Sequence, residues 1–343
     1  MFTVYSDKNI FENIILDREQ IPNWHNIFCN HADVCLDMTD QELEIELQDG
    51  TIIFEYVKLN GGKLPIAHKP FFSNVYQDYS IIVNNPRSAF FLDVTEDKAK
   101  EIQDSFGIIV QSLNSIDDNI LKGTYYKNLP VNSVCKNVNK IGWHCLLNFS
   151  LPPSNSIVLT DNFLFSNEDG NRGTANFIHF IDSILPDSLT TDFHILLLAQ
   201  EHKDKDQAWC ERKAGEIKTA FGNLNKPYNI IFELVFAETI HKRIAISNYY
   251  TLTPDKGFAI FKTNDNKTVH EDTDIQLDRI FNRLNKNEGD SEFLNADYSL
   301  HSIKKICLTV AQYISNRPND KNYRILGDCN KNKSLKNRLI NDV

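Results

Sequence analysis

The chain has 343 residues, of which 41% are hydrophobic and 24% are charged, and its formal net charge is −10 at pH 7. This length predicts two domains, because single hydrophobic cores stop growing at about 250–300 residues. The negative charge excludes a protein that binds phosphate over its whole surface, since such binding needs clustered Lys and Arg, but it is compatible with a carboxylate-lined metal site.

No targeting or membrane-spanning pattern is found in the sequence. Residues 1–9 carry an acid at Asp7 and lack a basic stretch followed by a long apolar run. No run approaches the roughly 18 apolar residues of a membrane span. The seven cysteines are an odd number without Cys-x-x-Cys spacing, which disfavours both disulfides and a zinc ribbon. We therefore expect a cytoplasmic protein with free thiols and no membrane contact.

The first predicted domain, residues 1–140, opens with a strand over Phe2–Ser6 and a short amphipathic helix that ends near Leu16. Residues 39–42 (Thr-Asp-Gln-Glu) form a capping-box pattern, so a helix is predicted to begin there. This helix is predicted to be short, because Asp49-Gly50 is a turn signal. The segment Thr51–Leu59 is rich in β-branched and aromatic residues and therefore resembles a strand.

The clearest unit of this half is a strand over residues 88–94, a helix over 95–106, a stop at Gly107 and a strand over 108–110. This order indicates a right-handed βαβ crossover and a parallel sheet. Open α/β sheets place their functional sites at the carboxyl ends of the strands. Three carboxylates are predicted to lie at such an end: Asp93, Glu96 and Asp97.

The second predicted domain, residues 150–320, repeats the alternation after a proline-containing joint between about residues 130 and 155. Near-continuous apolar strands separated by helices indicate a sheet covered on both faces. The predicted strands are Ile157–Thr160, Phe193–Ala199, Ile230–Phe236, Arg243–Ser247 and Gly257–Lys262. The predicted helices are Thr174–Leu185, Gln207–Phe221, Asp272–Leu284 and Leu300–Ile314. Residues 321–343 are predicted to be a poorly ordered polar tail. The predicted fold class is thus α/β, with two domains that each contain a mostly parallel sheet flanked by helices.

Acids of the first domain are candidates for a divalent-metal site. Mg²⁺ and Mn²⁺ prefer oxygen ligands and can activate water for attack on a phosphodiester. Asp7 follows the first strand, Asp78 precedes an apolar stretch and Asp97 opens the helix after the strand over 88–94. The second acid is Glu42 or Glu44. Each acid also has a structural interpretation as a helix cap, a first-turn acid or a loop residue.

The motifs around these acids resemble those of PIN-domain nucleases. Residues 4–11 (Val-Tyr-Ser-Asp-Lys-Asn-Ile-Phe) resemble the hydrophobic-x-Asp-x-Asn start of that family, and residues 95–99 (Thr-Glu-Asp-Lys-Ala) its Thr-x-Asp helix start. Asp78 lies about where the family carries its third acid, whereas Asp93 is an additional acid. The resemblance covers roughly residues 1–125. It implies a parallel-sheet endonuclease acting on RNA or DNA with Mg²⁺ or Mn²⁺. The implied catalytic residues are Asp7, Glu42, Asp78 and Asp97, and the implied metal ligands are Asp7, Asp78 and Asp97.

In the second domain, His241, Arg243 and Asn248 form a His-x-Arg-x-x-x-x-Asn pattern. It resembles the His-x-Lys-x-x-x-x-Asp core of phospholipase D-like domains, and the strand followed by Asp161 adds to the resemblance, which spans about residues 150–265. The chain has one copy of the motif, with Arg243 in place of Lys and Asn248 in place of Asp. The resemblance therefore implies phosphate binding or recognition rather than catalysis. Arg still binds phosphate, while a nucleophilic His241 would lack its orienting carboxylate.

From the sequence we expect a metal-dependent nuclease joined to a degenerate phospholipase D-like domain that recognises nucleic acid or a protein partner. By analogy, a nuclease domain joined to a recognition domain suggests a toxin or an antiviral defence effector. Two alternatives stay open. One is a catalytically inactive interaction subunit of a larger assembly, and the other is a phosphodiesterase that uses His241.

Overall fold

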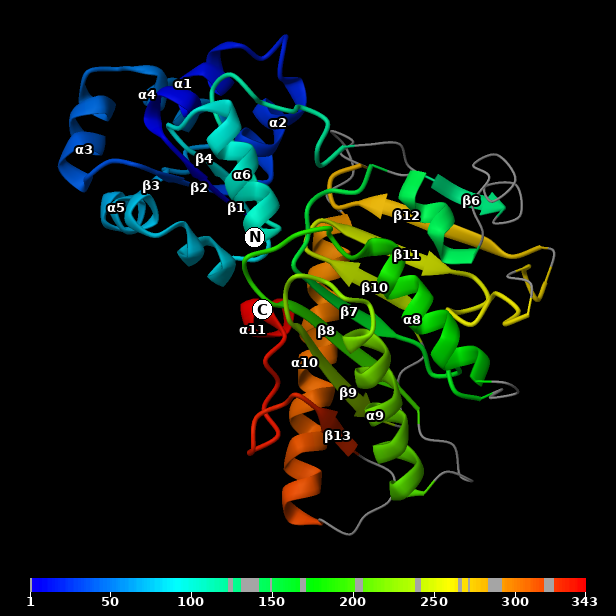
Figure 1. Ribbon diagram of the computed structural model, residues 1–343. Helices are drawn as coiled ribbons and strands as arrows, with labels where there is room; N and C mark the ends of the chain where they lie inside the picture. Colours follow the sequence, from blue (N-terminus) through cyan, green and yellow to red (C-terminus); the bar gives the residue numbers. More distant parts are fainter. Residues whose placement is uncertain are drawn as a thin grey trace. The chain divides into compact units, whose positions relative to one another are not determined.

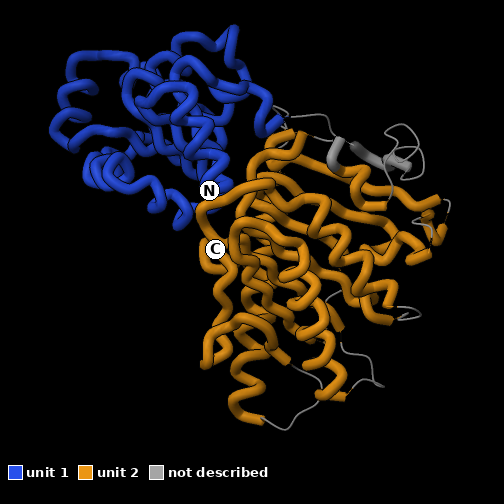
Figure 2. Tube along the Cα trace, in the orientation of Figure 1, with its two compact units in different colours: residues 1–123 blue, residues 124–343 orange. Residues whose placement is uncertain are grey.

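The computed structural model describes residues 2–122, 126–130, 142–148, 150–166, 171–200, 206–237, 242–264, 267–270, 272–282, 292–317 and 324–343. The chain divides into two compact units, Met1–Gly123 and Thr124–Val343 (Figure 2). Each unit is an α/β structure with its own sheet, as the sequence predicts.

The division lies at Gly123, whereas the predicted first domain runs to residue 140. Residues Tyr126–Pro130 form strand β6, which pairs antiparallel with β12 (Asp274–Arg279) of the second unit. A strand belongs to the sheet that satisfies its backbone N–H and C=O groups. This segment therefore belongs to the second unit and not to the first.

Unit 1 contains a parallel five-stranded sheet in the order β3-β2-β1-β4-β5, drawn in blue to cyan in Figure 1. Its strands are β1 (Phe2–Ser6), β2 (Ala32–Leu36), β3 (Ile66–Ala67), β4 (Ser88–Phe91) and β5 (Ile109–Gln111). Its helices are α1 (Lys8–Leu16), α2 (Pro22–Asn30), α3 (Asp40–Gln48), α4 (Ile52–Leu59), α5 (Lys69–Gln77), the 3₁₀ helix η1 (Tyr79–Asn84) and α6 (Glu96–Phe106). Because every pair is parallel, the carboxyl ends of the strands lie at one edge of the sheet.

Most predictions for unit 1 are confirmed, including β1, α1, the capping box of α3 and the βαβ unit around α6. Gly107 ends α6 with φ 63°, in the left-handed region that favours glycine. The strand-like interpretation of Thr51–Leu59 is wrong, since this segment contains α4. Ile53 and Tyr56, three positions apart, bury one helical face, and this packing outweighs the β propensity of the segment.

Within the described residues, unit 2 contains an eight-stranded mixed sheet in the order β13-β9-β8-β7-β10-β11-β12-β6. Its strands, besides β6 and β12, are β7 (Ser156–Thr160), β8 (Phe193–Ala199), β9 (Ile230–Phe236), β10 (Ile244–Ser247), β11 (Tyr250–Pro254) and β13 (Arg324–Gly327). Its helices are η2 (Gly142–Asn148), α8 (Arg172–Ile184), α9 (Gln207–Gly222), α10 (Glu292–Asn316) and α11 (Arg338–Asp342). Strands β7, β8 and β9 pair in parallel, and the other neighbours pair antiparallel, so the prediction of a mostly parallel sheet is wrong for this unit.

The central strands of this sheet are covered on both faces by helices (Figure 1). In β8, Ile195 and Leu197 belong to the core that includes residues of α8 and α9. Leu196 and Leu198 point the other way, into the core that includes residues of α10 and α11. This double burial explains the near-continuous apolar sequence of the strand.

Predictions for the C-terminal third need correction. The predicted helix Asp272–Leu284 contains strand β12, and the predicted strand Gly257–Lys262 forms an isolated bridge between Phe261 and Thr268. The predicted polar tail contributes β13 and α11, with Leu339 fully buried. Its few apolar residues are spaced so that they fill one core, which composition alone does not reveal.

Candidate functional site

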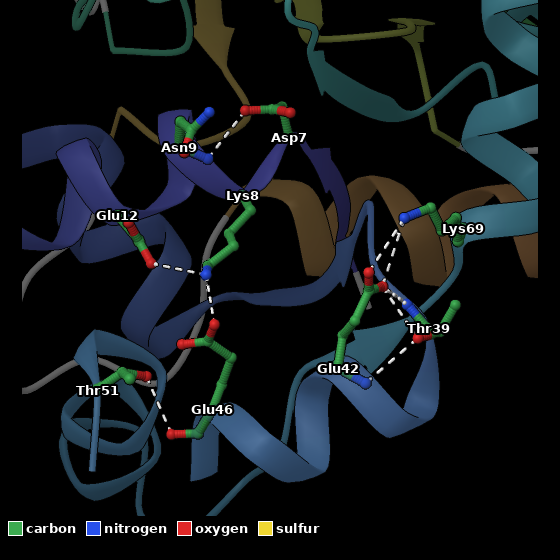
Figure 3. Close-up of polar contacts among 9 residues, drawn as sticks. All are labelled: Asp7, Lys8, Asn9, Glu12, Thr39, Glu42, Glu46, Thr51 and Lys69. Atoms are coloured by element: carbon green, nitrogen blue, oxygen red, sulfur yellow. Dashed lines mark hydrogen bonds and ion pairs between the residues drawn. The ribbon is translucent and has the colours of Figure 1, made fainter. Parts of the chain in front are cut away.

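Asp7 lies where β1 ends and α1 begins. Its Oδ1 accepts hydrogen bonds from the backbone N–H groups of Asn9 (2.8 Å) and Ile10 (3.4 Å), so it caps α1 (Figure 3). Burial raises the pKa of Asp7, and the negative charge of Asp93 raises it further. Asp7 is therefore both a cap and a half-buried acid with an acidic neighbour.

The Glu42 side chain takes part in capping the N-terminus of α3. Its Oε2 accepts from the backbone N–H (2.7 Å) and the hydroxyl (2.9 Å) of Thr39, and the Thr39 hydroxyl accepts from the Glu42 N–H (3.2 Å). These bonds complete the predicted capping box and lower the pKa of Glu42. Its carboxylate also lies 3.3 Å from Lys69 Nζ (Figure 3). The alternative acid, Glu44, is exposed and accepts from Gln48 Nε2 at 3.2 Å.

Asp78 and Asp97 are exposed and lie at helix starts. Asp78 accepts from the backbone N–H of Ser80 (2.9 Å) and caps η1. Hydrogen bonds from the Ser80 side chain and then from its backbone N–H lower the pKa of Asp78. Asp97 lies in the first turn of α6, whose cap is Thr95. In the part of the chain that the structure describes, no three His, Cys, Asp or Glu side chains form a group that could hold a metal ion. Asp7, Asp78 and Asp97, the ligands expected from the sequence, thus do not form such a group.

The structure places a different set of acids side by side. Asp37 directly follows β2, Asp7 directly follows β1, and Asp93 lies two positions beyond β4. Ser6 at the end of β1 pairs with Leu36 on one side and Phe91 on the other. These three adjacent parallel strands therefore end together, where α/β sheets place their sites. We call Asp7, Asp37 and Asp93 the acid edge; like the other acids that the structure describes, these three do not by themselves form a group that could hold a metal ion.

Backbone hydrogen bonds hold the acid edge in register. The Asp37 N–H donates to the Ser6 carbonyl (3.1 Å), and the Asp7 N–H donates to the Phe91 carbonyl (2.8 Å). Asp37 is not among the acids expected from the sequence, and Asp93 enters only as an additional acid. The position directly after a buried strand is the signal that could have identified Asp37.

The carboxylates of the acid edge affect one another. Burial raises the pKa of Asp37, and the charge of Asp7 raises it further. The Tyr76 hydroxyl accepts a hydrogen bond from the Asp93 N–H (3.1 Å). Burial raises the pKa of Tyr76 most, and the charges of all three acids raise it as well. Like charges gathered around one hydroxyl favour a bound cation.

Two lysines flank this edge. Lys8 forms ion pairs with Glu46 and, at 3.6 Å, with Glu12 (Figure 3). Lys69 begins α5, and its charge lowers the pKa of Asp37, although burial raises that pKa more. Lys69 is therefore a cation whose charge reaches Asp37 and whose ammonium is paired with a surface glutamate, Glu42.

In unit 2, Asn248 holds the start of β7 rather than facing a ligand. Its Oδ1 accepts from the N–H groups of Asn155 and Ser156, both at 3.1 Å, and its Nδ2 donates to Asn155 Oδ1 at 3.1 Å. The residue is fully buried. This geometry differs from the phosphate-binding role expected from the sequence.

Arg243 directly precedes β10 (Ile244–Ser247) and contacts the segment that follows β7. Its Nε lies 3.9 Å from Asp161 Oδ1, its Nη1 donates to the Asp255 carbonyl (3.2 Å), and its guanidinium lies 5.0 Å from the ring centre of Phe163. Asp161 is 1% exposed, and its carboxylate accepts from the N–H groups of Phe163 and Phe258. His241, the third residue of the expected motif, lies outside the described residues.

No protein-family model matches the chain, and no curated protein matches its sequence. Among the helices that the structure describes, none is both long enough and apolar enough to cross a membrane. Function is therefore inferred from the acid edge and from the surface around it.

Proposed function

We propose that unit 1 is a metal-dependent endonuclease and that the acid edge holds its Mg²⁺ or Mn²⁺. The main support is the position of Asp7, Asp37 and Asp93 at the carboxyl ends of three adjacent parallel strands. The all-parallel sheet agrees with the fold that the resemblance to PIN-domain nucleases implies.

The residues of the acid edge suit a hard divalent cation. Their oxygen donors are the type that Mg²⁺ and Mn²⁺ prefer, and the raised pKa values of Asp7 and Asp37 reflect partial burial and like charge that a cation would offset. Mg²⁺ usually keeps several waters and binds through one or two carboxylates plus substrate phosphates. Such water-mediated binding does not require three protein ligands in direct contact with one ion.

The chain's own residues have distinct tasks in this proposal. A bound ion supplies an activated water and stabilises the leaving oxygen. The cap on α1 fixes Asp7, and the backbone bond to Ser6 fixes the position of Asp37. Asp93 is exposed and thus accessible to a substrate, and its N–H donates to the Tyr76 hydroxyl.

Cleavage of labelled single-stranded and double-stranded RNA and DNA with Mg²⁺ or Mn²⁺ tests the proposal. Asp7→Asn, Asp37→Asn and Asp93→Asn are each expected to lower the rate at least about 100-fold, because losing even an outer partner of a metal site costs about 10–100-fold. Asp97→Asn and Asp78→Asn are the matched controls. Full activity of both Asp7→Asn and Asp37→Asn would overturn the proposal.

Unit 2 is proposed as the recognition half. The guanidinium of Arg243 lies over the ring of Phe163, which is 50% exposed. Arginine binds phosphate and exposed aromatic rings stack on bases, so this pair fits single-stranded nucleic acid. Phe163→Ala is expected to weaken oligonucleotide binding by unit 2 with little change in the free energy of unfolding. Unchanged affinity would remove this assignment.

Protein binding by unit 1 is the second candidate function. Several large apolar side chains of α3, α4 and β3 are exposed, and such side chains mark interaction surfaces when they gather. They are Ile45, Phe54, Leu59 and Ile66. If Leu59→Asp abolishes binding of a protein partner, and the wild-type protein shows no nuclease activity, the interaction role is favoured.

A further inference from the structure

We infer that Lys69 binds a substrate phosphate beside the acid edge, and that Glu42 competes with this phosphate by pairing with Lys69. The inference rests on the proposed function, because it assigns a substrate-binding group to the same site. It also identifies an acid, Glu42, that would restrain activity rather than support it.

Backbone contacts place Lys69 next to the acid edge. The N–H of His68 donates to the Leu36 carbonyl (2.9 Å), and the N–H of Lys69 donates to the Met38 carbonyl (3.1 Å). Both acceptors flank Asp37, so the start of α5 is fixed at the end of β2. The charge of Lys69 reaches Asp37, whose pKa it lowers against the larger effect of burial.

A cation beside the acid edge would reduce the repulsion between its carboxylates and a negatively charged substrate. A phosphodiester that approaches three carboxylates is repelled unless positive charge lies nearby. Lys8 is the other lysine at this edge, and its ammonium is shared by two carboxylates, Glu46 and Glu12. Lys69 forms an ion pair with Glu42, and exchange of this partner makes its ammonium available to a phosphate.

The contact between Glu42 and Lys69 can be exchanged at little cost. Their side chains are 49% and 46% exposed, and exposed ion pairs contribute little to stability. Helix α3, which carries Glu42, has no buried residue. Polar contacts hold it at Glu42 and at Glu46, as Figure 3 shows. Carboxylate and phosphate offer the same kind of acceptor, so they compete for one ammonium.

The sequence offers variants that separate charge from structure. Glu42→Gln keeps the capping box, since Gln also occupies that position well, and removes the charge that engages Lys69. Glu44→Gln makes the same change of net charge on the same helix, where the carboxylate contacts Gln48. Lys69→Met removes the ammonium, and Lys69→Arg retains a cation.

Binding of a fluorescein-labelled single-stranded oligonucleotide to the full chain in Ca²⁺, measured by fluorescence anisotropy, tests the inference. Lys69→Met is expected to weaken binding and to reduce the slope of log Kd against log salt by about 0.7, the value for one lost contact to a single strand. Lys69→Arg is expected to preserve that slope. Glu42→Gln is expected to tighten binding several-fold more than Glu44→Gln, and the gain is expected to vanish in the Glu42→Gln/Lys69→Met double variant.

An unchanged affinity and slope for Lys69→Met, or an equal effect of Glu42→Gln and Glu44→Gln, would overturn the inference. So would absence of measurable binding by Glu42→Gln. If the expected binding pattern is found but the wild-type chain cleaves nothing in Mg²⁺ or Mn²⁺, the nuclease proposal fails and the phosphate site stands. If the wild-type chain cleaves nucleic acid and Lys69→Met binds the oligonucleotide as wild type does, the phosphate site fails and the nuclease proposal stands.

Discussion

The carboxylate of Glu233, in strand β9, accepts a hydrogen bond from the backbone N–H of Asn337 (3.0 Å), the residue that caps α11. A second bond comes from the Lys336 N–H (2.7 Å). One buried acid thus fixes the C-terminal segment against strand β9 of the unit 2 sheet. Since Asn337 and Glu233 are both 0% exposed, this contact is part of the core.

The contribution of Glu233 to the stability of the protein is expected to fall as the pH rises through about 7. Burial raises the pKa of Glu233 to about 7, although the two N–H bonds lower it. The folded-state pKa lies above the unfolded value, so the stabilising contribution is complete below about pH 4.5 and is lost as the pH rises through about 7. Urea unfolding of wild type is expected to lose about 2 kcal/mol between pH 5 and 8 through this group. Glu233→Gln removes the dependence, and an identical pH profile for this variant would contradict the prediction.

Leu339→Ala is expected to lower the free energy of unfolding by about 2–5 kcal/mol, the usual cost of truncating a buried leucine. Leu339 is fully buried in the core beside α10, whereas Leu308, on α10, is 55% exposed. Leu308→Ala is therefore the control and is expected to change stability by less than about 0.5 kcal/mol. Equal values for the two variants in urea unfolding would show that the C-terminal segment is not part of the core.

Asn248→Ala is expected to destabilise the protein by about 2 kcal/mol or more, because it leaves the buried N–H groups of Asn155 and Ser156 without their acceptor. Oligonucleotide affinity of the folded variant is expected to match that of wild type. The surface residue Asn295 provides the control, as Asn295→Ala alters an exposed side chain. Lost affinity together with unchanged thermal stability would instead support phosphate binding by Asn248.

Gly257→Ala is expected to destabilise unit 2 by about 1–3 kcal/mol. Gly257 has φ +82°, and a Cβ there would lie 2.7 Å from the Oδ2 of Asp161, whose carboxylate is held by two backbone N–H groups. Gly215, on α9, has open space where a Cβ would point. Gly215→Ala is expected to be neutral or to stabilise by up to about 1 kcal/mol, since Ala favours a helix. The two changes in Tm, compared by calorimetry, check this prediction.

The local elements were predictable from the sequence because their signals are local. The capping box at Thr39 and the Gly107 stop act within one helical turn, and the apolar run Phe193–Ala199 shows its burial in its own composition. For the same reason Asp7 is a helix cap and Asp97 a first-turn acid, as their structural interpretations predict, whereas Asp78, interpreted as a loop residue, caps η1. A carboxylate at a helix start finds N–H partners two or three residues away.

The sequence by itself determined the α/β class, the two-unit organisation and most helices and strands, because backbone propensities and burial periodicity act over short stretches. Tertiary structure decided that β12 is a strand, that the C-terminal segment fills a core and that Asp37 and Asp93 flank Asp7. These features depend on which strands become neighbours. Strand order is set by pairing between segments far apart in the chain, and no local pattern around Asp37 encodes the acids that stand beside it.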